Sequence, residues 1–278
     1  MRDWALCAGA AAEGSCWTLI GKGVDGLKKY WLSGALLLLL LLTLSGCFFR
    51  EPEDLYQSPE QSADYLSLTQ TIRNVKDSLA QEYGVEVEDV SVMSGDNTAL
   101  IQLQDLDRDG ERETAVTFFR VSEAEKPLKI YFFTRTAEDT YTVSAMVEGN
   151  GTAIYRVDYV DLNGSGCKEV VVSWQMSTGV YLLGAYSLEE AMVRSLQYAA
   201  SAPAGNATAQ GLPDREALRA TEWMTTVYDN YALYDLDQDT RTELAVVRVD
   251  KAGTNSAVDL YGWRDGSFNV SYTHLRAN

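Results

Sequence analysis

Three nine-residue segments of this chain share one spacing of oxygen-bearing side chains. They read DLDRDGERE, DLNGSGCKE and DLDQDTRTE, at residues 105–113, 161–169 and 235–243. Each places side-chain oxygens at positions 1, 3, 5 and 9, and the backbone carbonyl at position 7 can add another ligand. Oxygen ligands so arranged are the kind that Ca²⁺ prefers. Three copies in one chain also indicate an internal repeat, which constrains the architecture.

The segments around these loops have the composition of β-strands. After the second loop, for example, Val170, Val172, Trp174 and Met176 alternate with Ser173 and Gln175. This period of two residues is typical of a strand and not of a helix. Similar apolar runs lie on both sides of the first loop, at residues 99–103 and 115–121, before the second loop at 154–160 and after the third loop at 244–249. Each loop is therefore predicted to join two strands. This argues against an EF-hand or a dockerin, in which a helix must follow the loop.

Further strands are predicted after each loop, so that one repeat holds about four strands, the size of a propeller blade. They lie at residues 129–133 and 141–147, at 180–186 and 192–196, and at 258–263 with another beginning at 267. The interval between the second and third loops is the longer one. It contains a small-residue stretch at 199–208, predicted to be an inserted loop, and a short predicted helix at 213–220.

These loops and strands resemble the FG-GAP or VCBS repeats, the integrin-α-like β-propeller blades of secreted and surface proteins. The resemblance covers about residues 97–268. It implies a mainly β fold, a partial β-propeller of about three four-stranded repeats, with Ca²⁺ bound in each loop. Carried over by position, the ligands are Asp105, Asp107, Asp109 and Glu113; Asp161, Asn163, Ser165 and Glu169; and Asp235, Asp237, Asp239 and Glu243.

The match to the family pattern is not uniform. Glycine stands at position 6 as Gly110 and Gly166, but the third loop has Thr240 there. The second loop replaces two carboxylates by Asn163 and Ser165. An alternative is that some loops, above all the second and third, are acidic surface turns without a metal.

The N-terminal segment predicts the location of the protein. Lys28 and Lys29 precede an apolar run over residues 30–44, and the following Ser45-Gly46-Cys47 resembles a bacterial lipobox. Residues 1–47 are therefore predicted to be a signal peptide, with residues 1–26 a wrongly extended reading frame. A lipid on Cys47 would anchor the protein at the extracytoplasmic face of the cell membrane. The alternative is an uncleaved transmembrane anchor.

The remaining chain divides into a tether at 48–57, a helix at 58–84 and the β repeats at 85–269. Leu68, Ile72, Val75 and Leu79 form one apolar stripe on the helix, which we expect to pack on the first repeat. Residues 270–278 match the translation of a sequencing adapter. The natural chain is therefore expected to continue beyond a truncated third repeat.

Composition favours a binding module over a catalyst. The formal net charge of −17 argues against a nucleic-acid partner. The single histidine, His274, lies in the adapter-like segment, so histidine-dependent nucleophile systems are not expected. We expect a lipid-anchored, non-catalytic protein that binds an extracellular protein or glycan or organises the envelope. The alternatives are a carbohydrate-active enzyme on a propeller fold and a dockerin-like assembly module.

Overall fold

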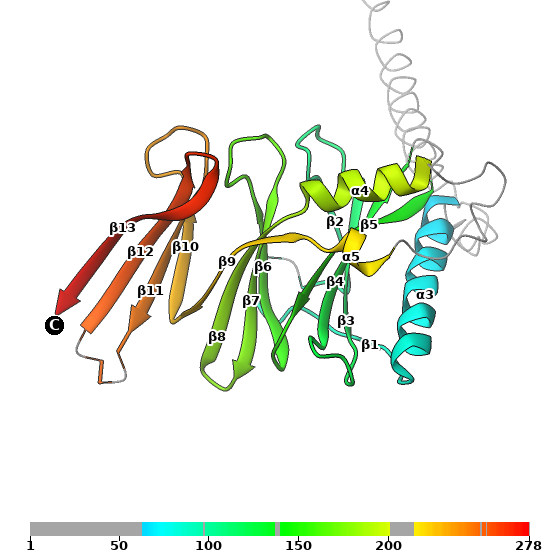
Figure 1. Cartoon of the computed structure of the whole chain (residues 1–278), viewed down its shortest axis with the longest axis horizontal. Coiled ribbons are helices and arrows are strands. Elements are labelled where there is room, and N and C mark those ends of the chain that lie inside the picture. Colours follow the sequence, from blue (N-terminus) through cyan, green and yellow to red (C-terminus); the bar gives the residue numbers. More distant parts are fainter. Residues whose placement is uncertain are drawn as a thin grey trace, which may run out of the picture. The chain divides into compact units, whose positions relative to one another are not determined.

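The computed structural model describes residues 63–96, 98–136, 140–200, 214–250, 252–253 and 255–277 (Figure 1). The helices are α3 (Ala63–Tyr83), α4 (Glu189–Ala200) and α5 (Arg215–Leu218). The strands are β1 (Glu88–Asp89), β2 (Ile101–Gln104), β3 (Thr114–Arg120), β4 (Leu128–Arg135), β5 (Tyr141–Gly149), β6 (Ala153–Val160), β7 (Glu169–Ser177), β8 (Val180–Ser187), β9 (Thr221–Tyr228), β10 (Asn230–Tyr234), β11 (Glu243–Val249), β12 (Asn255–Arg264) and β13 (Ser267–Ala277).

The strands form three antiparallel sheets, so the predicted mainly β fold is confirmed. The first sheet has the order β1-β3-β4-β5, with β2 pairing along the same strand β3. The second is β6-β7-β8-β9 and the third is β10-β11-β12-β13. None of the three sheets, as described, closes on itself.

Each sheet contains the same unit, which consists of a strand, an acidic loop and an antiparallel partner strand. The first loop (residues 105–113) joins β2 to β3, the second loop (161–169) joins β6 to β7, and the third loop (235–243) joins β10 to β11. The prediction that each loop lies between two strands is therefore confirmed. The three loops lie at the same end of the sheets, at the top of Figure 1.

The sheets pack face to face through two buried apolar clusters. One joins the first and second sheets and includes Phe118, Ile130 and Trp174. The other joins the second and third sheets and includes Val171 and Val246. Because alternate residues of a strand point to opposite faces, Val171 and Trp174 of β7 serve different interfaces. The middle sheet thus packs on both of its neighbours.

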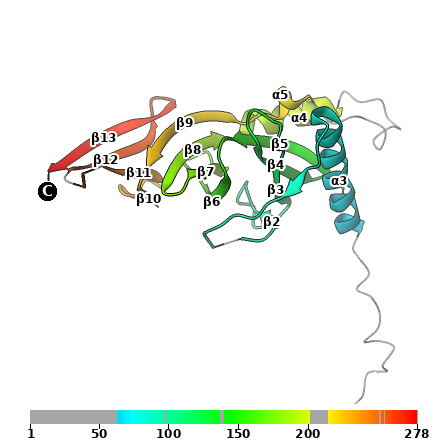
Figure 2. The same ribbon diagram turned by 90° about the horizontal axis from the view of Figure 1, so that it is seen from below.

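Helix α3 covers the free face of the first sheet (Figure 2). Its residues Leu68, Val75 and Leu79 are buried in one apolar cluster with residues of β3, β4 and β5, and Ile72 is partly buried beside them. The predicted packing of this apolar stripe on the first repeat is confirmed. The helix ends as predicted at Gly84, whose φ of 68° is readily adopted by glycine.

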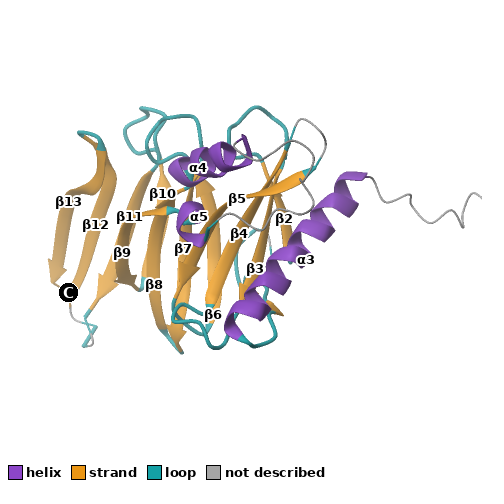
Figure 3. Ribbon diagram, turned by 45° about the vertical axis from the view of Figure 1, so that its right-hand side comes forward, coloured by secondary structure: helices purple, strands orange, loops and turns teal. Residues whose placement is uncertain are grey.

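The predicted strand at residues 192–196 is wrong, because these residues belong to α4. Leu188, Ala191 and Ser195 are buried at helical spacing, and Glu189 and Glu190 favour a helix N-terminus. The fourth strand of the second sheet is β9, which follows the insertion. The predicted helix at 213–220 is present as the shorter α5, capped by Asp214. Both helices lie close to β5 (Figure 3).

Several sequence predictions fall outside the described residues: the signal peptide at 1–47 with Cys47, the tether at 48–57, residues 58–62 of the predicted helix, and residues 201–208 of the predicted insertion. Strand β13 extends to Ala277 and pairs with β12, so residues 270–277 are part of the third sheet. Their origin in an adapter stays a prediction. Among the described helices, none combines the length and apolar character needed to cross a membrane.

Candidate metal centre

The three loops share one backbone conformation. Positions 4 and 6 have positive φ in each: Arg108 and Gly110, Gly164 and Gly166, and Gln238 and Thr240, with values between 61° and 96°. Backbone N–H groups donate to the side chains at positions 1 and 3 of every loop. The loop geometry is therefore a property of the repeat. Thr240 keeps it without glycine, in a conformation that is uncommon for a β-branched residue.

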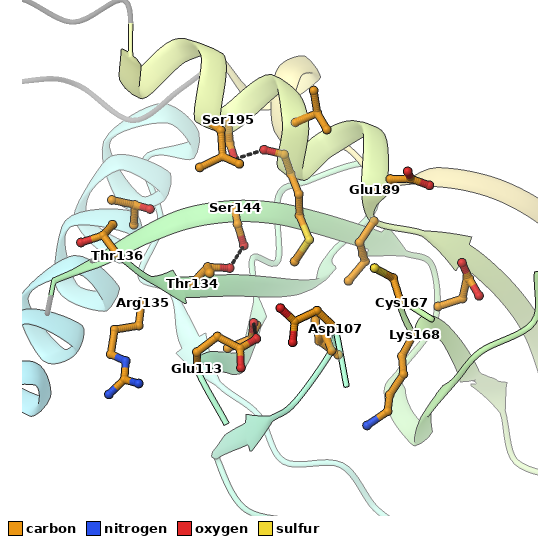
Figure 4. Close-up of a pocket in the computed structure, with 18 residues that line it drawn as sticks. Asp107, Glu113, Thr134, Arg135, Thr136, Ser144, Cys167, Lys168, Glu189 and Ser195 are labelled. Atoms are coloured by element: carbon orange, nitrogen blue, oxygen red, sulfur yellow. Dashed lines mark hydrogen bonds between the residues drawn. The ribbon is translucent and has the colours of Figure 1, made fainter. Parts of the chain in front are cut away.

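In the first loop, four carboxylates converge. Asp105, Asp107, Asp109 and Glu113 each place one oxygen within 4.8 Å of the others. Asp105 comes at the end of β2 and Glu113 at the start of β3, so the strand pair fixes the two ends of the group. Figure 4 shows Asp107 and Glu113 pointing toward one another.

Two oxygens of the first loop, Asp105 Oδ1 and Glu113 Oε2, are buried and have no hydrogen-bond partner among the described residues. A buried carboxylate oxygen is costly unless a cation or a donor compensates it. Burial, together with the negative charges of Asp107 and Asp109, raises the pKa of Glu113. The donor set is all oxygen and strongly acidic, so the residues present fit Ca²⁺.

The third loop gathers a smaller group. Asp235, Asp237 and Asp239 place one oxygen each within 4.8 Å of the others, and all three are exposed. Glu243, the predicted fourth carboxylate ligand, instead accepts a hydrogen bond from the backbone N–H of Leu236 at 2.8 Å. The loop therefore offers three convergent carboxylates and not four.

In the second loop, an arginine and backbone N–H groups of the protein compensate the negative charge of the carboxylates. Asp161 is 6% exposed and accepts hydrogen bonds from Gly164 N, Gly166 N and Nη1 of Arg108, the last at 3.0 Å. Glu169 accepts from the Leu162 N–H at 2.8 Å, and burial raises its pKa to about 7. The side-chain oxygens of the other two predicted ligands, Asn163 and Ser165, also accept from backbone N–H groups. Arg108, from the first loop, thus brings a positive charge to the second.

Neighbouring loops are joined directly to one another. Lys168 of the second loop donates from its backbone N–H to Leu106 O at 2.7 Å and from Nζ to Asp105 O at 2.6 Å. Thr242 of the third loop donates to Asp161 O at 2.9 Å. Sequence reasoning missed Arg108 and Lys168 as partners of other loops. The available signal was a basic residue inside an otherwise acidic motif.

A cavity of about 520 Å³ opens beside the first loop (Figure 4). Asp107 and Glu113 lie at its edge, Cys167 and Lys168 come from the second loop, and α4 borders it on the opposite side. Cys167 is a free, exposed cysteine. Sequence reasoning did not foresee this cavity, because it placed a strand where α4 stands.

A second charged group, here called the Glu148 cluster, lies on the first sheet. Glu148, on β5, is 7% exposed and accepts from Lys129 Nζ at 2.5 Å, from Arg215 at 3.2 Å and from Arg219 at 3.1 Å. Burial by itself would raise the pKa of Glu148, but the three cations outweigh it and hold that pKa below its usual value. The cluster ties α5 to β4 and β5.

No protein-family model matches this chain, and no curated protein matches it. The resemblance to the FG-GAP and VCBS repeats therefore rests on the loops and their strands.

Proposed function

We propose that this chain is a calcium-binding repeat protein of the FG-GAP or VCBS type, and that its first loop is the strongest site. One observation carries this proposal. Four carboxylates converge there, and two of their buried oxygens, Asp105 Oδ1 and Glu113 Oε2, have no hydrogen-bond partner. Bound Ca²⁺ would supply the missing positive charge and hold the end of β2 to the start of β3.

The three sheets are, in this proposal, blades of a β-propeller. Each has an acidic loop between two paired strands, and successive sheets stack face to face through buried apolar residues. Closed propellers use about four to eight blades. The isolated chain is therefore expected to self-associate through the open face of its third sheet. Size-exclusion chromatography checks this, and a stable monomer would mean that the sheets form an open stack.

The proposed location is the extracytoplasmic face of the cell membrane, through a lipid on Cys47. Metabolic labelling with an alkynyl fatty acid tests the anchor. Wild-type chain should carry the label, while a Cys47→Ser variant should carry none and should be released or remain an uncleaved precursor. An unlabelled wild-type chain would favour a transmembrane anchor.

The proposed role is non-catalytic binding of an extracellular protein or glycan, or envelope organisation. The loops favour this over an assembly module of the dockerin type. A dockerin needs a helix after its loop, whereas the strands β3, β7 and β11 follow the three loops here.

Calorimetric titration of the full chain with Ca²⁺ tests the proposed function. We expect a dissociation constant of roughly 0.1–1 mM, the range of extracellular modules. On charge the second loop should be the weakest site, since it has two carboxylates and Arg108 already pairs with one of them. Asp107→Ala should remove the strongest phase, and Asp77→Ala, on exposed α3 surface, should leave it unchanged. Equal heat and affinity in wild type and Asp107→Ala would show that the first loop is not a site.

A further inference from the structure

Helix α4 is an addition to the repeat. It lies between β8 and β9, the third and fourth strands of the second sheet. In the third sheet the corresponding strands, β12 and β13, are joined by only Asp265 and Gly266. The sheet can therefore form without a helix at this place. What α4 adds is one wall of the cavity beside the first loop (Figure 4).

This helix presents apolar side chains to two sides. Leu188 and Ala191, at its N-terminal end, are buried in the core between the first two sheets. Val193 and Leu196 are 48% and 66% exposed, and both line the cavity together with Met192. When an apolar molecule covers exposed apolar side chains along a concave surface, their removal from water lowers the free energy. The helix wall therefore suits an aliphatic group.

The opposite wall is formed by oxygen-bearing side chains. Thr134 and Ser144, from β4 and β5, are hydrogen-bonded to each other at 2.9 Å, and Thr114 stands beside them at the start of β3. Asp107 and Glu113 of the first loop lie at the edge of the same cavity. Its volume of about 520 Å³ is within the range of roughly 300–1,000 Å³ that is usual for small-molecule sites.

The charges around the cavity determine which head group fits. Four acids line it, Asp107, Glu113, Glu169 and Glu189, against two bases, Arg135 and Lys168. Arg135 pairs with Glu111, and Lys168 Nζ donates to Asp105 O. Without a metal ion this acidic excess would repel a carboxylate head and would offer a hydroxyl oxygen no cation to bind. With Ca²⁺ in the first loop the repulsion is relieved, and an ion that takes six to eight oxygens can accept one from a ligand.

We propose that this cavity binds a small aliphatic molecule with an oxygen-bearing head, a carboxylate or hydroxyl, placed against the first loop. The inference rests on the proposed function, because the head requires the calcium ion. The aliphatic body lies along Met192, Val193 and Leu196, and the hydroxyls of Thr134 and Ser144 face it from the sheet side.

Cys167 provides a local reporter for occupancy. It lines the cavity and is exposed, so a bound ligand should shield its thiol from alkylation. The full chain is purified in lipid nanodiscs, which keep free detergent out of the cavity. The rate of iodoacetamide labelling at Cys167 is then followed by peptide mass spectrometry. Decanoate, decanol and decyltrimethylammonium are compared, each in calcium and in chelator.

Decanoate in calcium should slow the labelling by about 1 + [L]/Kd, which is roughly tenfold at ten times its Kd. Decanol should protect in calcium as well, and decyltrimethylammonium should not. Leu196→Glu should abolish protection, since the charge enters the apolar wall at an exposed position where folding is not at risk. Gln197→Glu is the matched control, because it adds the same charge to an exposed residue of α4 outside the cavity lining. Calcium titration should be unchanged in both variants.

The outcomes separate this inference from the proposed function. If calorimetry shows heat of calcium binding at the first loop but decanoate does not protect Cys167 from alkylation, the inference is overturned and the proposed function stands. Equal protection in calcium and chelator, or stronger protection by the trimethylammonium compound, shows that the head does not meet the ion and also overturns the inference. If no heat of calcium binding is measured, both the proposed function and the inference are overturned. Protection that needs calcium and is lost only in Leu196→Glu supports both.

Discussion

The first loop and the Glu148 cluster both contain buried carboxylate oxygens, but they differ in whether the protein supplies the compensating positive charge. Around Glu148, one buried carboxylate meets Lys129 and two arginines, so its charge is compensated within the protein. In the first loop, four carboxylates converge and two of their oxygens are buried without a donor. A buried charge must be compensated from some source. The contrast supports the proposal that the first loop takes its cation from solution.

The second loop stands between these two cases. It keeps the backbone shape of the first, but Asp161 receives Arg108 as its cation. If the proposed calcium site is correct, the same motif forms a metal loop in the first repeat and a structural turn in the second, where a neighbouring loop supplies the positive charge. Removing one charge in each region, and measuring the free energy of unfolding in calcium and in chelator, tests this contrast.

The largest effect is expected for Glu148→Gln. Removing the carboxylate leaves Lys129 buried, with a 1% exposed side chain, beside two arginines. Breaking a buried pair on one side costs about 3–5 kcal/mol. Urea unfolding should show this loss equally in calcium and in chelator. Glu82→Gln, which removes an exposed partner of Arg215, should cost less than about 1 kcal/mol. If the loss of stability in Glu148→Gln differed between calcium and chelator, the Glu148 cluster would not be compensated within the protein alone.

The next effect is expected for Asp105→Asn. Wild-type chain at ten to a hundred times the calcium Kd should gain about 1.4–2.7 kcal/mol over the chelated chain. The variant should lose most of this gain, because a charged ligand with a buried oxygen is replaced by a neutral amide. In chelator it should be no less stable than wild type. Unfolding curves at matched calcium concentrations measure both quantities, with Asp77→Asn as the control. A large loss in chelator would mean that Asp105 has a structural role.

A smaller effect is expected for Arg108→Met. The guanidinium is about half exposed, while Asp161 is 6% exposed, so the lost ion pair should cost about 1 kcal/mol in chelator. Calcium should restore part of this stability, since Asp161 is then free to bind the ion. Arg112→Met, which changes an exposed arginine of the same loop, is the control. An identical loss with and without calcium would show that the second loop cannot be converted into a metal site.

The smallest effect is expected on mild acidification. Burial raises the pKa of Glu148 in the folded state, but its three cations outweigh burial and hold that pKa below its usual range. Its contribution to stability is therefore complete above the unfolded pKa and is lost as the pH falls through the folded value. From about pH 5 to about pH 4 only a fraction is lost. Unfolding of wild type and Glu148→Gln should show a shallower pH slope for the variant, and parallel slopes would contradict this.

Much of this architecture could be predicted from local spacing. The acidic loops, the strands that frame them and the amphipathic helix α3 depend on residues close together in the chain, where side-chain oxygens and apolar periods are directly visible. The fourth strand of the second sheet could not be predicted in this way. The strand was predicted at residues 192–196, but these residues belong to α4. So short a run is compatible with either a strand or a helix.

The sequence by itself determined that three loops carry oxygen-bearing side chains at one shared spacing, and which residues those are. Only the tertiary structure decided how the loops differ. Arg108 meets Asp161 across 53 residues, and Lys168 meets Asp105 across 63, because stacked sheets bring successive loops side by side. The cavity likewise exists only because an insertion in the second repeat lies over the loop of the first. Such contacts depend on how sheets pack and not on local spacing, so no motif within one loop could reveal them.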